Sequence, residues 1–196
     1  MEKAMSNQAQ AERETRLTRI RQLSNMMKWF VTVLLILVAV ISAGLVSALL
    51  LPAILDVSTA IFEIAPVERK LSEVPFGQRL GLIALVFSAF FLLSRLFWNI
   101  RQLFVQFHNG AFFTSSTQTR ILNAGLWLLA FGFFDILSKP VASVLLTWDH
   151  ALGDRSLVVE LTGSELFFLV FGSLMLVFGW IMREAASLAD ENRQFV

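Results

Sequence analysis

The stretch that decides the fold is WFVTVLLILVAVISAGLVSALLL, residues 29–51, in which 23 consecutive side chains carry no charge. A helix needs about 20 predominantly apolar residues to cross a hydrocarbon core about 30 Å thick. Basic residues precede the run, as they do in a secretory signal peptide, but the apolar part of such a peptide has only about 7–15 residues. The sequence therefore predicts an uncleaved helix that spans a membrane.

The composition of the chain also indicates a membrane protein. Of the 196 residues, 56% are hydrophobic and 16% are charged, whereas a soluble domain carries about 25% charged residues. The absence of cysteine excludes disulfides, catalytic thiolates and cysteine-ligated metals. His108 and His150 lie far apart in the sequence, and the formal net charge is +1. We therefore expect the lipid bilayer as a partner, no metal, no cofactor and no direct binding of nucleic acid.

Three further apolar segments predict three more spans, at about residues 80–98, 121–148 and 166–182. In the second span the uncharged run between Arg79 and Arg95 has only 15 residues. A helix of this length spans about 22 Å. We expect this helix to continue to Trp98, and both arginines to direct their charges toward the membrane interfaces.

These segments predict an all-α fold, an integral membrane four-helix bundle. Its parts are a basic amphipathic segment (residues 1–28), a four-span domain (residues 29–182) and a tail (residues 183–196). Of the 16 Lys and Arg residues, 11 lie on the side of the two termini and four on the other side. Because the short loops rich in Lys and Arg stay in the cytoplasm, we expect both termini to be cytoplasmic, in a bacterial inner membrane.

The connections carry helix signals of their own. In the first connection Ile54, Leu55, Ile61 and Phe62 share a helical face and predict a short helix on the membrane surface before Pro66. Asn109-Gly110 predicts the end of the second helix. Ser115 with Gln118 predicts a capping box for the third. TGSEL, residues 162–166, predicts a cap for the fourth. We expect His108, at the corner after the second span, to make a polar contact.

The basic segment before the first span carries an apolar stripe of Leu17, Ile20, Leu23 and Met27 at helical spacing. Its arginines are explained by the setting of topology. Attraction of the helix to anionic lipid, at about 1 kcal/mol per basic residue, and docking of the helix to a specific partner are the alternatives.

Two stretches, FHNGAFFTSSTQTRILNAG (residues 107–125) and REAASLADEN (residues 183–192), carry a resemblance to a known family. They resemble a bacterial family of four-span membrane proteins catalogued as domain of unknown function 2975, and the resemblance covers roughly residues 80–196. It implies a four-helix membrane fold. It implies no chemistry and no functional residues.

The third span contains two charged residues, Asp135 and Lys139, followed by Pro140. Counted from Arg120, they lie about 22 Å and 28 Å along the helix. Their i,i+4 spacing lets Lys139 neutralise Asp135, so the pair would only mark the outer end of the span. The alternative is a proton or cation station. We see no acidic or polar residue at matching depth in the other spans.

Small residues recur at spacings that suit close helix packing, which in lipid depends on close approach of the backbones. The predicted packing glycines are Gly44, Gly125, Gly132, Gly172 and Gly179. The sequence carries no catalytic motif. We therefore expect a non-enzymatic accessory or regulatory subunit that binds another membrane protein or a second copy of itself. The alternative is a small transporter or channel component that uses Asp135.

Overall fold

In the computed structural model, residues 2–51, 61–64, 67–70, 73–111, 114–151, 155 and 157–194 are described. These residues form four long α-helices: α1 (Glu2–Leu50), α2 (Phe76–His108), α3 (Ser115–Thr147) and α4 (Gly163–Gln194). Each helix contains a segment that is long and apolar enough to cross a membrane. The predicted all-α fold with four membrane-spanning helices is confirmed.

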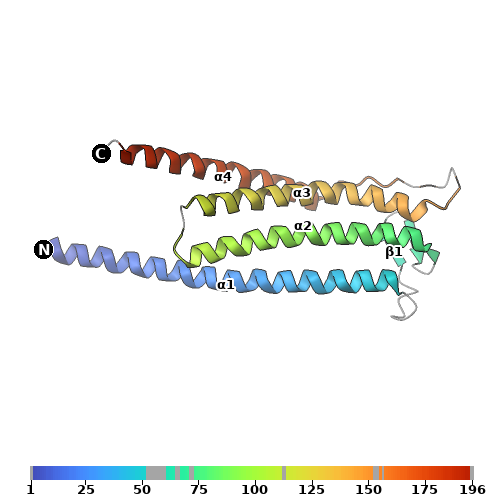
Figure 1. The fold of residues 1–196 in the computed structure, drawn as a ribbon, viewed down its shortest axis with the longest axis horizontal. Helices are drawn as coiled ribbons and strands as arrows, with labels where there is room; N and C mark the ends of the chain where they lie inside the picture. The colour runs from blue at the N-terminus through green and yellow to red at the C-terminus, as the bar shows by residue number, and fades with distance from the viewer. Residues whose placement is uncertain are drawn as a thin grey trace.

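The helices lie side by side in chain order, with α1 and α4 at opposite edges (Figure 1). Extensive contacts join α1 to α2, α2 to α3 and α3 to α4. The start of α1 and the end of α4 lie at the same end of the molecule, which we call the terminus end. The opposite end, which carries the connection between α1 and α2, is the hairpin end. Both termini therefore lie on one side of any membrane that the helices cross.

The hairpin end carries two short antiparallel strands, β1 (Ile61–Ile64) and β2 (Val67–Lys70), in which Ile61 pairs with Lys70. The predicted surface helix is therefore wrong for Ile61 and Phe62, which lie in β1. The other two residues of that prediction, Ile54 and Leu55, lie outside the described residues. The segment is rich in branched and aromatic side chains, which favour strands, and this local preference prevails over the helical spacing.

The end of α2 follows the prediction from Asn109-Gly110. Gly110 has a φ of +80°, which is in the left-handed region. The backbone N–H of Ala111 donates to the carbonyl of Gln106 at 2.9 Å, and that of Gly110 donates to the carbonyl of Phe107 at 3.1 Å. This is the Schellman arrangement, which satisfies the last carbonyls of a helix.

The start of α3 differs from the prediction by one residue. Thr114, not Ser115, is the N-cap, and its side chain accepts a hydrogen bond from the backbone N–H of Thr117 at 3.3 Å. Gln118 does not complete a capping box. It donates instead to the carbonyl of Met182 at 3.3 Å, so that it joins α3 to α4.

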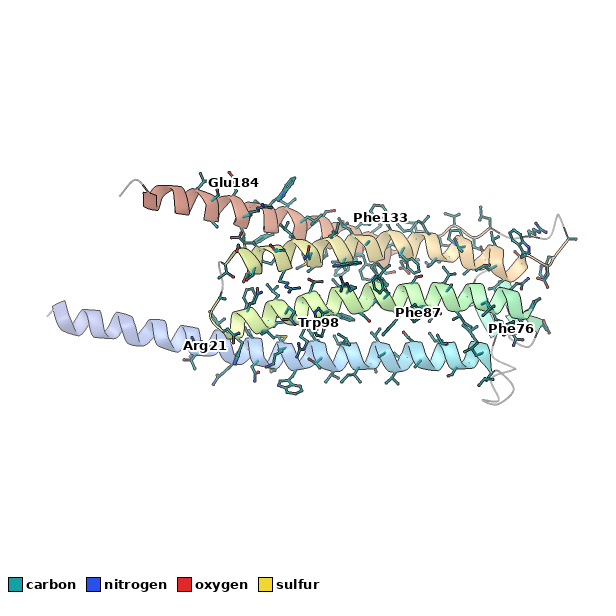
Figure 2. All side chains as sticks on the ribbon, in the orientation of Figure 1. Arg21, Phe76, Phe87, Trp98, Phe133 and Glu184 are labelled. Atoms are coloured by element: carbon teal, nitrogen blue, oxygen red, sulfur yellow. The ribbon has the colours of Figure 1, made fainter. Side chains whose placement is uncertain are left out.

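A cluster of buried apolar side chains lies at the hairpin end and contains Leu49, Leu82, Leu146 and Val158. Many other large apolar side chains are exposed, among them Phe87 and Phe133, which are 64% and 57% exposed and are labelled in Figure 2. Such a continuous apolar surface is expected where lipid is the solvent.

Candidate functional site

One ion pair joins α3 to α4 at the hairpin end. Lys139 Nζ lies 2.8 Å from Glu165 Oε1. The Glu165 side chain is fully covered, and that of Lys139 is 27% exposed. Because Glu165 belongs to the first turn of α4, the ion pair fixes the start of that helix against the later part of α3.

The local sequence around Glu165 positions its carboxylate. The backbone N–H of Thr162 donates to Glu165 Oε2 at 2.7 Å, and the Thr162 hydroxyl donates to the same oxygen. This is the glutamate half of a capping box, so the predicted cap at residues 162–166 is present. One carboxylate thus caps α4 with one oxygen and binds Lys139 with the other.

This arrangement corrects the prediction that Lys139 neutralises Asp135. Among the described residues, no ion pair or side-chain hydrogen bond engages the Asp135 carboxylate. The long lysine side chain reaches Glu165, which is completely covered, whereas Asp135 is only partly buried. An unpaired charge costs more free energy at the covered Glu165 than at the partly exposed Asp135. Pairing of Lys139 with Glu165 is therefore favoured over pairing with Asp135.

Glu165 is the charged residue that bounds the fourth apolar run, so the sequence of that run alone predicts no partner for it. The positions of the charged residues along the two helices do indicate the pair. Lys139 lies 19 residues from Arg120, and Glu165 lies 18 residues from Arg183, which correspond to about 28 Å and 27 Å along α3 and α4. Two residues at nearly equal depth on adjacent antiparallel helices can meet.

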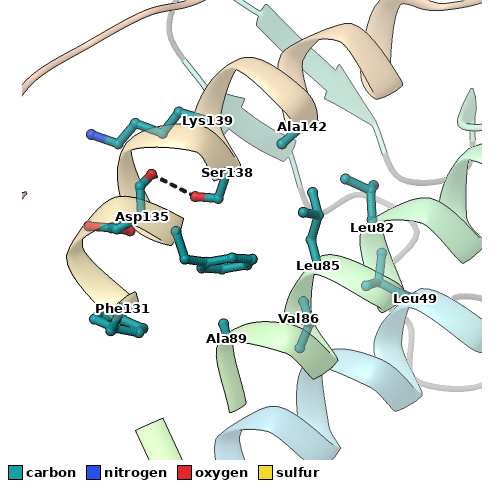
Figure 3. A pocket seen from close by; sticks show the side chains of 11 residues that line it. Leu49, Leu82, Leu85, Val86, Ala89, Phe131, Asp135, Ser138, Lys139 and Ala142 are labelled. Atoms are coloured by element: carbon teal, nitrogen blue, oxygen red, sulfur yellow. Dashed lines mark hydrogen bonds between the residues drawn. The ribbon is translucent and has the colours of Figure 1, made fainter. Parts of the chain in front are cut away.

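A cavity of about 240 Å³ lies beside this part of α3, between it and the ends of α1 and α2. Its lining is mostly apolar and includes Leu49, Leu82 and Phe131, with Asp135, Ser138 and Lys139 on the α3 side. In Figure 3, Asp135 and Lys139 lie together on one side of α3, and Ala142 lies nearer to α2.

Pro140 lies within α3, which continues to Thr147. A proline inside a helix leaves carbonyl groups of the preceding turn without their usual donors. The Ser138 hydroxyl donates to the carbonyl of Asp135 at 2.8 Å (Figure 3), and the Ser143 hydroxyl donates to that of Pro140 at 2.9 Å. The carbonyl that Pro140 leaves without its donor is that of Ile136, four residues earlier, so these two bonds do not replace the lost one; α3 nevertheless remains continuous to Thr147.

Four of the five predicted packing glycines lie where α3 contacts α4. A methyl group at Gly125 would lie 3.0 Å from the carbonyl oxygen of Gly172, and one at Gly172 would lie 3.0 Å from the backbone nitrogen of Leu129. The space at Gly132 is limited by Phe168 at 3.0 Å, and that at Gly179 by Leu122 at 2.8 Å. The two backbones approach as closely as glycine allows.

Gly44 does not share this role within the chain. No described atom lies within 4 Å of the place that a side chain would occupy there, and the residue is exposed on α1. The helix that packs on α1 is α2, and α1 contacts it with a different face, on which Leu49 is buried.

At the terminus end, the side chains of α1 around the predicted apolar stripe differ in exposure. Ile20 is 43% exposed and Leu23 is 56% exposed, whereas Ser24, on the adjoining face, is 4% exposed. His108 Nδ1 lies 3.1 Å from the carbonyl oxygen of Arg21, which is the polar contact expected of this histidine. Thus α2 covers one side of this part of α1 and leaves Ile20 and Leu23 exposed. Met27, at the end of the stripe, is half-buried, and the side chain of Leu17 is not described.

No protein-family model, no curated protein and no solved structure matches the chain. The resemblance to domain of unknown function 2975 therefore stays a prediction. In the described part of the chain, no three His, Asp or Glu side chains gather in a way that could hold a metal ion.

Proposed function

We propose that this multi-pass membrane protein is a non-enzymatic accessory or regulatory subunit of the bacterial inner membrane. Both termini would lie in the cytoplasm, as the excess of Lys and Arg at the terminus end supports. Its partner would be another membrane protein or a second copy of the chain. The resemblance to the four-span family is compatible with this role and adds no chemistry to it.

The exposed stripe of α1 carries this proposal. Ile20 and Leu23 lie six or more residues before Trp29, the first residue of the apolar run, which is about 9 Å or more beyond that run along the helix. They are nevertheless 43% and 56% exposed. Apolar side chains that lie outside the hydrocarbon and remain uncovered are typical of a surface that docks on another molecule.

The course of α1 supports a regulatory role for that surface. It is one helix from Glu2 to Leu50, 49 residues long, and it projects past the other helices at the terminus end (Figure 1). A partner bound at Ile20 and Leu23 would therefore act on the same helix that crosses the membrane and packs on α2.

A matched pair of variants tests this function. Leu23→Glu places a charge on the stripe, and Gln22→Glu places the same charge on the next residue of the same exposed turn. After solubilisation of native membranes in mild detergent, we expect the wild type and Gln22→Glu to retain a co-purifying protein or a second copy, and Leu23→Glu to lose it. Equal retention by all three proteins would contradict docking through the stripe.

The cavity beside Asp135 favours a second candidate, a small transporter or channel component. A carboxylate that has no ion pair or hydrogen bond with a described side chain, next to an apolar cavity of about 240 Å³, is a suitable station for a proton or a cation. This candidate requires Asp135 itself, whereas the accessory role does not, so a single substitution separates them.

A further inference from the structure

Three charged side chains lie close together in depth toward the hairpin end. Asp135 and Lys139 are one turn apart on α3, and the carboxylate of Glu165 on α4 lies 2.8 Å from the ammonium of Lys139. Two carboxylates and one ammonium leave one negative charge without compensation. Because Glu165 engages Lys139 and is itself fully covered, the uncompensated charge is that of Asp135.

Asp135 also lines the cavity of about 240 Å³ beside α3, together with Ser138 (Figure 3). The carboxylate has no ion pair or hydrogen bond with a described side chain. The Ser138 hydroxyl donates to the backbone carbonyl of Asp135 at 2.8 Å, so its hydrogen is already engaged. A charge in mainly apolar surroundings is stabilised by a partner of opposite charge, and a ligand in the cavity could be that partner.

Two aromatic rings near Asp135 add to its attraction for a cation. Phe131 and Phe134, which precede Asp135 in α3, line the same cavity. The ring of Phe131 packs edge to face on that of Phe168, with 5.2 Å between the ring centres, which fixes its position. The face of an aromatic ring carries partial negative charge and attracts cations. The carboxylate and the rings together favour a positively charged ligand.

The rest of the lining indicates which kind of cation fits. A metal ion such as Ca²⁺ takes about 6–8 oxygen ligands, whereas the described lining offers side-chain oxygens only from Asp135 and Ser138. Lys139 also lines the cavity, but its charge is compensated by Glu165. All other described lining residues are Leu, Val, Ala or Phe. The cavity therefore suits an organic cation with an apolar body better than a metal ion.

We propose that this cavity binds a small apolar amine, whose ammonium pairs with Asp135 and whose apolar body lies against Leu49 of α1 and Val86 of α2. The volume of about 240 Å³ is below the roughly 300–1,000 Å³ of sites for drug-sized ligands, so a phenyl ring with a short chain is a suitable size. Asp135 lies about 22 Å along α3 from Arg120, within the hydrocarbon, and the amine would enter from the bilayer. The inference rests on the second candidate function, a station at Asp135, and names the class of its cation.

Two probes that differ in one group test the site. 4-Phenylbutylamine is a cation at neutral pH, and 4-phenylbutanol joins the same apolar body to a neutral hydroxyl. Equilibrium dialysis of the full chain in phosphatidylcholine nanodiscs, compared with empty nanodiscs, separates saturable binding from partition into lipid. We expect the amine to bind with a Kd about tenfold or more lower than that of the alcohol. Equal binding of the two probes would overturn the proposal.

Asp135→Asn separates recognition of the charge from the apolar cavity. We expect this variant to bind the amine as weakly as the alcohol, and to bind the alcohol as the wild type does, because asparagine keeps the shape of the side chain without its charge. Asp135→Glu keeps the charge and should keep the preference for the amine. An unchanged preference in Asp135→Asn would contradict the pairing of the amine with this carboxylate.

A second pair of variants tests the location of the ligand. Ala89→Phe places a ring in the cavity and should abolish saturable binding of both probes. Ala84→Phe, at an exposed position of the same helix outside the described lining, should leave it unchanged. Equal binding by these two variants would place the amine elsewhere and overturn the proposal. Dialysis reports binding alone, whereas the cellular phenotype of Asp135→Asn tests transport, so failure of the amine site and failure of the transport function are separate outcomes.

Discussion

Lys139 and Glu165 lie 2.8 Å apart across the contact between α3 and α4, and the carboxylate of Glu165 also caps the helix to which it belongs. The pair therefore links two events that would otherwise be separate, the start of α4 and its attachment to α3. Asp135, one turn before Lys139, takes no part in this pair.

The first prediction concerns this ion pair. Glu165→Gln keeps the shape of the side chain but leaves Lys139 without its counter-charge, and it weakens the cap. We expect its melting temperature in detergent to fall by several degrees. The double variant with Lys139→Met should recover part of that loss, because it removes the unpaired ammonium. A double variant less stable than both single variants would show that the pair is not coupled.

The second prediction concerns the close contact between α3 and α4. Gly125→Leu should destabilise the protein by about 1–3 kcal/mol, the usual effect of overfilling a packed site, because the carbonyl oxygen of Gly172 lies 3.0 Å from the position of the new Cβ. Gly44→Leu is the matched control, since the space at Gly44 is open within the chain. Thermal unfolding in detergent measures both variants. Equal stability of the two would mean that Gly125 does not limit the approach of the helices.

The third prediction concerns orientation. The chain has no cysteine, so single cysteines report without interference. Ser187→Cys at the terminus end should be shielded from an impermeant thiol reagent in intact cells, whereas Leu157→Cys, at a position 67% exposed on the hairpin side of α4, should react. Labelling of the first and protection of the second would reverse the proposed orientation.

The fourth prediction separates the two candidate functions. Asp135→Asn keeps the size and hydrogen bonding of the side chain but cannot titrate, and the ion pair of Lys139 with Glu165 remains. If the protein is an accessory subunit, this variant keeps its partner and its full cellular phenotype. Complete loss of function in a folded Asp135→Asn protein would instead support transport through Asp135.

The parts of the fold that were predictable from the sequence depend on local physical constraints. Runs of uncharged residues specify spans because a charged side chain is costly in hydrocarbon, and the spans are helical because lipid offers the backbone no hydrogen bonds. Gly110 and Thr162 mark helix ends because capping depends on nearby residues. The glycines of α3 and α4 were identifiable for a similar reason, since their spacing repeats along one face of each helix.

The parts that were not predictable depend on which residues meet between helices. Lys139 had a possible partner four residues away and another on the next helix, and only the relative depth of α3 and α4 decides between them. Arg95 likewise had two directions available. Its guanidinium lies 5.4 Å from the ring centre of Trp127, on α3, and 6.0 Å from that of Phe91, so it points into the span, and the expectation that it reaches the interface is wrong. Periodicity within one segment contains no information about either choice.

The central claim is that the exposed stripe of α1 docks on a protein. A photoreactive amino acid at Leu23, compared with one at Gln22 on the same turn, tests it in native membranes. The account predicts that light produces at Leu23, and much less at Gln22, a cross-linked product whose added mass is that of one protein, either a partner or a second copy of the chain. Products at Leu23 that contain only lipid, or equal cross-linking at the two positions, would contradict it.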